Sequence, residues 1–131
     1  MLTAFKINNL KDIFRQFPKI KLVYFFGSQA ASQPGPLSDY DFAVYLAEKE
    51  KLKMLDLKCK LLDSLSRFLK TDKVDVVILN LAESPELKYN IIKEGKMLLA
   101  KEPYKALIEP RILNEYFDFR ILLKRYKLTA G

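Results

Sequence analysis

The chain has 131 residues, half of them apolar, and a formal net charge of +7, with no histidine and a single cysteine. This length and apolar content suffice for a hydrophobic core, so we expect residues 1–131 to form a single domain. Without histidine and with one cysteine, the chain lacks the usual ligands of a zinc site, the usual base of acid–base catalysis and the cysteine pairs of a disulfide framework. Any catalysis must therefore depend on carboxylates.

The sequence contains no long uncharged apolar run, and Lys6, Asn8 and Asn9 interrupt its first residues. We therefore expect neither a membrane span nor a secretory signal, and the scarcity of cysteine fits a cytoplasmic protein. The positive charge favours an acidic partner, which can be a nucleotide, a nucleic acid or an acidic protein surface. Charge alone does not choose among them.

Apolar residues at helical spacing predict an amphipathic helix over about residues 5–17, ended by Pro18. Residues 20–26 are almost continuously apolar, which is typical of a strand in the middle of a sheet covered on both faces. Prolines and a glycine within residues 32–36 predict an irregular loop, and a second strand is expected over residues 39–46.

A long helix is predicted over about residues 48–69, and a third strand over residues 74–79. The apolar stripe of this long helix is expected to be formed by Leu55, Cys59, Leu62, Leu65 and Leu69.

Ser84 as N-cap, Pro85 at the first helical position and Gly95 after the last turn indicate a short helix. Its inward residues are expected to be Leu87, Ile91 and Ile92. Residues 96–100 then predict a short edge strand.

A last helix is predicted over about residues 104–128, and one of its faces carries Ile112, Tyr116, Phe119, Leu123 and Tyr126. We expect this aromatic face to pack on the sheet, with a protein interface as the alternative reading. The order of elements predicts an α/β (α+β) fold, a mixed β-sheet packed with helices in a single domain.

Gly27-Ser28 ends the first predicted strand, and ten residues later Asp39-Tyr40-Asp41 begins the second. A glycine allows the backbone to approach a bulky anion, and a serine offers a hydroxyl and an N–H group to phosphate oxygens. Because side chains alternate along a strand, Asp39 and Asp41 point the same way, and two adjacent carboxylates favour a hard cation such as Mg²⁺.

Asp75 lies in the apolar third strand, where an unpaired buried charge would be costly. The alternative reading is a capped or ion-paired strand end, with Asp72 as the competing acid. A Gly-Ser pair alone is usually a turn, and an Asp-x-Asp pair alone is usually a solvated strand edge. Their occurrence together with a third carboxylate favours an active site.

This pattern resembles the signature of the DNA polymerase β-like nucleotidyltransferases, and the small size resembles the minimal nucleotidyltransferase (MNT) group. In that group the third carboxylate lies on a later strand, where Asp75 matches it. The predicted C-terminal helix, with residues 115–119, is also similar to the group. The resemblance implies the nucleotidyltransferase fold over most of the chain.

The resemblance also implies a metal-dependent transfer of AMP from ATP to a hydroxyl group. Asp39, Asp41 and Asp75 would be the catalytic residues and would ligate two Mg²⁺ ions, and Gly27 and Ser28 would bind the β- and γ-phosphates.

Small members of the group are typically antitoxins paired with an all-helical HEPN ribonuclease, which some of them silence by attaching AMP to a tyrosine. The resemblance therefore implies a heteromeric complex with a HEPN toxin, and nucleic acid is not expected to be the main partner.

The chain departs from the family pattern directly after Gly-Ser. The family usually continues x-Ala-Arg-Gly, whereas this chain has Gln29-Ala30-Ala31-Ser32 and so lacks the arginine. Either another cation replaces it, or nucleotide affinity and activity are reduced.

Two other functions therefore stay open at this point. One is a non-catalytic antitoxin that neutralises the HEPN toxin by binding alone. The other is a basic nucleic-acid-binding domain, which the lack of a clustered Arg/Lys stripe with exposed aromatic residues disfavours.

Overall fold

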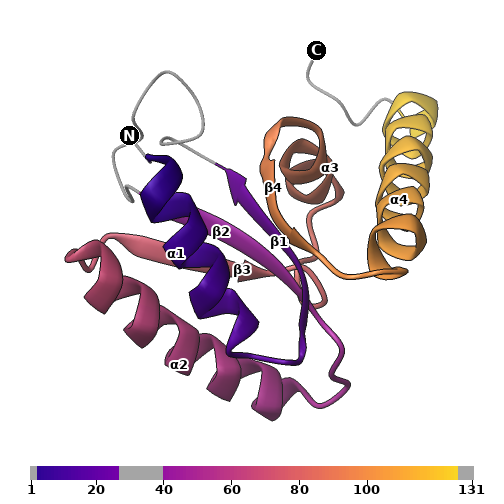
Figure 1. Cartoon of the computed structure of the whole chain (residues 1–131). Helices are drawn as coiled ribbons and strands as arrows, with labels where there is room; N and C mark the ends of the chain where they lie inside the picture. The colour runs from indigo at the N-terminus through magenta and orange to yellow at the C-terminus, as the bar shows by residue number, and fades with distance from the viewer. Residues whose placement is uncertain (1–2, 27–39, 127–131) are drawn as a thin grey trace.

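The structure is a computed structural model that describes residues 3–26 and 40–126, and Figure 1 shows the arrangement of their elements. The helices are α1 (Ala4–Arg15), α2 (Lys51–Leu69), α3 (Pro85–Glu94) and α4 (Tyr104–Tyr126). The strands are β1 (Ile20–Phe26), β2 (Tyr40–Leu46), β3 (Val74–Ile78) and β4 (Lys96–Ala100). The predicted order of elements is confirmed. None of these helices is long and apolar enough to cross a membrane.

The four strands form one sheet in the order β3-β2-β1-β4. β1 pairs antiparallel with β2 and β4, whereas β2 and β3 are parallel. A parallel pair needs a long crossover connection, and α2 provides it. The predicted mixed sheet is therefore confirmed, and so is the edge position of β4.

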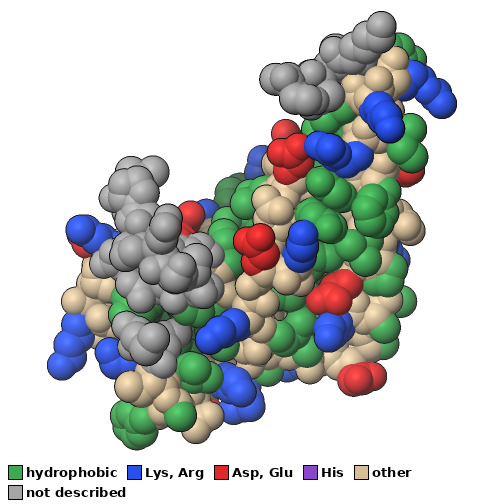
Figure 2. Space-filling view, turned by 90° about the horizontal axis from the view of Figure 1, so that it is seen from above, with side chains coloured by type: hydrophobic (Ala, Val, Ile, Leu, Met, Phe, Trp, Pro, Cys, Tyr) green, Lys and Arg blue, Asp and Glu red, His purple; other side chains and the backbone are tan. Residues whose placement is uncertain are grey.

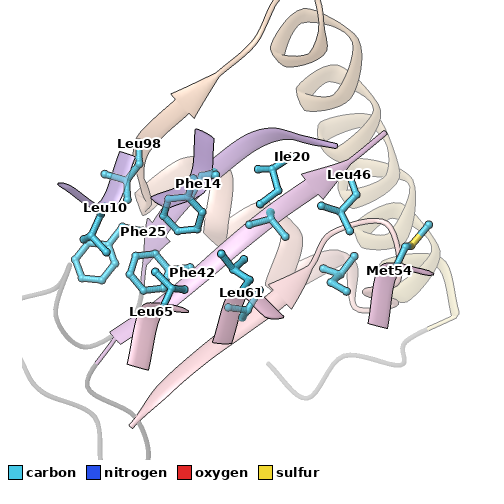
Figure 3. Packing of buried hydrophobic residues seen from close by; sticks show 14 of the residues in the cluster. Leu10, Phe14, Ile20, Phe25, Phe42, Leu46, Met54, Leu61, Leu65 and Leu98 are labelled. Atoms are coloured by element: carbon cyan, nitrogen blue, oxygen red, sulfur yellow. The ribbon is translucent and has the colours of Figure 1, made fainter. Parts of the chain in front are cut away.

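α1 and α2 cover one face of the sheet, and strand alternation decides which side chains meet them (Figures 1 and 3). Phe42, Val44 and Leu46 of β2 point to this face and are fully buried. The ring of Phe42 meets the ring of Phe14 from α1 edge to face, with centroids 5.4 Å apart. We call this side of the sheet the α1/α2 face.

α3 and α4 cover the opposite side, which we call the α3/α4 face. Its buried residues are Leu22, Tyr24, Ala43, Leu79, Ile91, Ile108 and Ile112. Within β1 the register shifts between Ile20 and Leu22, and as a result Ile20 and Val23 both belong to the α1/α2 face. The nearly continuous apolar character of β1 thus reflects a strand buried on both sides, as predicted.

The helix caps follow the residues that the sequence offers. Thr3 accepts a hydrogen bond from the N–H of Lys6 and begins α1 (3.2 Å). Ser84 accepts one from the N–H of Leu87 and begins α3 (3.2 Å), with Pro85 in the first turn and Gly95 as C-cap. The predicted boundaries of α3 are therefore confirmed.

Two predictions about inward faces are confirmed only in part, since the core includes Leu62, Leu65 and Leu69 of α2 and Ile91 and Ile92 of α3. Leu55 and Cys59 are exposed, and the buried face of α2 consists of Met54, Leu61, Leu65 and Leu69. In α3 it is Ile91 that is buried, while Leu87 is exposed. Apolar residues cover a wide arc of both helices, so spacing alone does not fix the side that meets the sheet.

The predicted packing of the last helix holds for only part of its length. Ile108 and Ile112 are buried, Tyr116 is half-buried, and Tyr126 is exposed. The first half of α4 therefore packs on the sheet, and its C-terminal half does not.

A buried hydroxyl connects the sheet to α4. Tyr24 in β1 donates a hydrogen bond of 2.6 Å to Oε2 of Glu109 in α4. Burial raises the pKa of the Tyr24 hydroxyl, and the hydrogen bond and the negative charge of Glu109 raise this pKa further. The hydroxyl is therefore a fixed donor that positions α4 against β1.

Replacing Tyr24 with Phe is expected to lower the free energy of unfolding by about 1–2 kcal/mol near neutral pH, because Glu109 loses its donor. In the unfolded chain the hydroxyl ionises near pH ~10, whereas in the folded protein it stays protonated to higher pH. The wild type should therefore lose stability relative to Tyr24→Phe as the pH rises above this value.

Urea unfolding at neutral and at strongly alkaline pH measures this difference. Tyr126→Phe is the matched control, since the Tyr126 ring is exposed. If the wild type exceeds Tyr24→Phe in free energy of unfolding by the same amount at both pH values, the role of the Tyr24 hydroxyl as donor to Glu109 is contradicted.

Candidate active site

The parallel register of β2 and β3 places two acidic residues side by side. Asp41 of β2 and Asp75 of β3 are direct register partners. On the other side of Asp41, the partner in β1 is Phe26, the last residue of that strand. Three neighbouring strands thus carry Phe26, Asp41 and Asp75 at one level, near one end of the sheet.

Both carboxylates belong to the α3/α4 face. Their neighbours Phe42 and Val76 are buried on the α1/α2 face, and side chains alternate along each strand. Asp41 is half-buried and Asp75 is exposed. The predicted orientation of Asp41, opposite to that of Tyr40 and Phe42, agrees with this arrangement.

Asp75 is held by its own strand. Its Oδ1 accepts a hydrogen bond of 2.9 Å from the N–H of Val76. The strand is apolar, but Asp75 is its second residue and points to the open end of the α3/α4 face, so the charge is not buried. The high cost of burial that the sequence suggests is therefore avoided.

Gly27, Ser28 and Asp39 lie outside the described residues, as does the segment 29–32 that lacks the arginine. The described chain stops at Phe26 and resumes at Tyr40. Because Phe26 pairs with Asp41, and Tyr40 directly precedes Asp41, both ends of the intervening segment lie at the acidic end of the sheet.

Asp41 and Asp75 contribute hard oxygen atoms, the ligands that Mg²⁺ prefers. Over residues 3–26 and 40–126, no three acidic, histidine or cysteine residues form a group that could hold a metal ion. The third predicted ligand, Asp39, does not belong to these ranges.

Two cavities lie at the other end of the sheet. One of about 350 Å³ lies between the end of β4 and the start of α4, lined by Lys101, Glu109 and Leu113 among others. The other, of about 560 Å³, lies beside Lys19 and Glu48. Neither is lined by the acidic pair.

Glu48 at the second cavity accepts hydrogen bonds from the N–H groups of Glu50 and Lys49, at 3.2 and 2.9 Å, and these bonds lower the pKa of its carboxyl group. This carboxylate fixes the turn before α2.

One residue that secures the acidic pair is not evident from the sequence. The side chain of Asn80 accepts a hydrogen bond from the N–H of Leu46 (2.9 Å) and donates one to its carbonyl oxygen (2.8 Å). These bonds join the chain after β3 to the end of β2 and help to hold the register that pairs Asp41 with Asp75. The only signal in the sequence is a polar amide directly after a buried strand.

The family model described as polymerase beta, nucleotidyltransferase matches residues 8–104 of the chain. The chain belongs to this family. The matched region contains every strand and the acidic pair. The resemblance inferred from the Gly-Ser and Asp-x-Asp motifs is thus confirmed at the level of the family. The comparison with curated protein sequences gives no match.

Solved structures share the fold of this nucleotidyltransferase. A mutant of the toxin–antitoxin MntA-HpeT matches with a TM-score of 0.73 and 24% identity, covering 92% of this chain and 94% of the other. The same values hold for a toxin–antitoxin structure with AMP-PNP. A complex of tri-AMPylated Shewanella oneidensis HEPN toxin with MNT antitoxin matches with a TM-score of 0.72 and 23% identity, covering 95% of each chain. The predicted nucleotidyltransferase fold is therefore confirmed.

Replacing Asp75 with Asn is expected to raise the free energy of unfolding by about 0.5 kcal/mol in chelator and low salt, because like charges on paired strand positions repel. Asparagine keeps an oxygen that can accept the hydrogen bond from Val76. Urea unfolding at low and high salt measures the effect, which should shrink in high salt.

Asp72→Asn is the matched control, since this exposed acid lies in the turn before β3. A loss of stability above about 1 kcal/mol in Asp75→Asn would contradict the prediction, because it would mean that the carboxylate makes a favourable interaction beyond its hydrogen bond with Val76.

Proposed function

We propose that this nucleotidyltransferase transfers AMP from ATP to a hydroxyl group of a partner HEPN toxin, and that it thereby acts as the antitoxin of the pair. The observation that carries the proposal is the register partnership of Asp41 and Asp75 beside the end of β1. It brings acids from two separate segments together at the end of the sheet where β1 ends at Phe26.

Asp39, Asp41 and Asp75 would hold the metal, with two Mg²⁺ ions as the expected number. Carboxylate oxygens on one face of a sheet fit this hard cation. When bound, Mg²⁺ supplies positive charge that neutralises phosphate oxygens. Gly27 and Ser28 would bind the β- and γ-phosphates through backbone N–H groups and the hydroxyl.

The reaction exchanges one bond at the α-phosphorus and moves one proton. The oxygen of the acceptor hydroxyl bonds to the α-phosphorus of ATP, and the bond from this phosphorus to the oxygen that bridges to the β-phosphate breaks. Pyrophosphate leaves with that oxygen. We assign Asp75 as the group that accepts the proton of the hydroxyl, since its carboxylate is exposed at the acidic end of the sheet.

The partner is proposed from the related structures. Chains of the same fold occur in a complex of HEPN toxin with MNT antitoxin, in which the toxin is tri-AMPylated, and in a toxin–antitoxin structure with AMP-PNP. The acceptor hydroxyl is proposed to be a tyrosine. The net charge of +7 suits both a triphosphate and an acidic protein surface.

A second candidate function is an antitoxin that neutralises the toxin by binding alone. Ala31 in place of the family arginine favours it, because an alanine cannot contact phosphate by charge. The two functions differ in whether AMP appears on the partner.

The experiment incubates the protein with Mg²⁺, ATP labelled in the adenine moiety, and the partner HEPN protein. Label should appear on the partner, and Asp41→Asn or Asp75→Asn should each reduce its rate at least ~100-fold, because each removes a proposed metal ligand or proton acceptor. Chelation of Mg²⁺ should abolish labelling. Asp72→Asn is the control. It makes the same substitution three residues earlier, in the turn before β3, and this variant should label the partner at the wild-type rate.

Neutralisation of the toxin that survives both substitutions, with no label on the partner in any sample, would overturn the enzymatic proposal and support the binding function. If both variants still label the partner at the wild-type rate, Asp41 and Asp75 are not needed for the transfer of AMP.

A further inference from the structure

α4 is longer than the sheet that it packs against. β4 ends at Ala100, which pairs with Leu22 near the start of β1, and α4 follows it, to the right of α3 in the view of Figure 1. Its 23 residues span about 34 Å, whereas the seven residues of β1 span about 24 Å. The last turns of α4 contribute no residue to either buried cluster, so they extend beyond the part of the helix that packs on the sheet.

These last turns carry large apolar side chains that are about half exposed. The exposed fractions are 52% for Phe117, 58% for Ile121, 49% for Leu122 and 61% for Tyr126. We call these four residues the distal face of α4. Figure 2 shows hydrophobic side chains gathered along this helix. Phe117 and Ile121 form one i,i+4 pair and Leu122 and Tyr126 form another, and at about 100° per residue the two pairs lie on different sides of the helix.

α4 is braced where it leaves the sheet. The Tyr116 ring stacks on Tyr89 of α3, with centroids 3.9 Å apart and planes 6° from parallel. Beside this stack, Nζ of Lys88 lies 2.8 Å from Oε1 of Glu115, and only 12% of the Lys88 side chain is exposed. The distal face begins at the next residue, Phe117. It is therefore presented on a fixed helix.

We propose that the distal face of α4 is the docking surface for the acceptor protein, the HEPN-class toxin of the proposed function on which this inference rests. A helix with apolar residues around most of its circumference is typically covered on more than one side. α3 covers one side of α4, and docking of the toxin would cover the distal face.

Charge decides between the toxin and a second copy of this chain. Residues 117–126 contain Arg120, Lys124 and Arg125 but a single acid, Asp118. A two-fold dimer through this short segment would bring the same cations together from both copies, and like charges across an interface disfavour association. We therefore expect a partner surface that is apolar at its centre and acidic at its rim.

The test is a double substitution, Ile121→Glu with Leu122→Glu, measured by titration calorimetry against the HEPN protein and by light scattering for mass; Phe117 is kept because its ring packs against Tyr89. Both residues are exposed, so the fold should be kept, which circular dichroism and thermal melting check. We expect the dissociation constant for the partner to rise about 100-fold or more, as for the loss of central apolar contacts. Leu52→Glu on α2, a side chain with 80% exposure far from α4 in sequence, is the matched control and should bind like the wild type.

AMP labelling of the partner is measured in the same samples. Loss of binding in the double variant with normal binding in Leu52→Glu supports the docking surface, whether or not the wild type labels the partner. A wild type that binds but never labels overturns the enzymatic proposal alone. Unchanged binding by the double variant overturns the docking surface and leaves the enzymatic proposal standing. If the wild type is a dimer and the double variant is a monomer that still binds the partner, a second copy occupies the distal face and the docking proposal is overturned. A wild type that binds no HEPN protein also overturns the docking proposal.

Discussion

The parallel pairing of β2 with β3 is the constraint on which the rest of the molecule depends. Asp41 and Asp75 lie more than thirty residues apart in sequence, and this pairing alone makes them neighbours. Side chains alternate along a strand, so a slip of one residue in β3 would turn Asp75 toward the buried α1/α2 face. Burial of Val76 and Ile78 on that face, and the hydrogen bonds of Asn80 to Leu46, oppose such a slip.

The two faces of the sheet differ in the size of their apolar clusters and in whether they carry the acidic pair. The α1/α2 face holds the larger apolar cluster, including Phe14 and Phe42, and secures the fold. The α3/α4 face holds a smaller cluster, and its open end carries the acidic pair. α4 is joined to this side through Tyr24 and Glu109 and continues past it.

The sequence was most informative where a single physical signal dominates. The apolar runs of β1 and β2 predicted strands, and Ser84-Pro85 predicted a helix start, as observed. The register then places Asp75 beside Asp41. It failed at Cys59, Leu87 and the end of α4, because apolar residues around a wide arc of a helix do not say which side meets the sheet, or where the sheet ends. The contributions of Gly27, Ser28 and Asp39 stay predictions, as they lie outside the described residues.

The central claim is that the acidic pair binds a divalent cation beside a nucleotide. The most direct measurement is a crystal structure with Mn²⁺ and a non-hydrolysable ATP analogue, in which anomalous scattering locates the metal. The account predicts a Mn²⁺ peak in direct contact with a carboxylate oxygen of Asp41 and one of Asp75, with the triphosphate of the analogue against the ion. A nucleotide bound with its metal away from both residues, or no metal at this end of the sheet at saturating Mn²⁺, would contradict it.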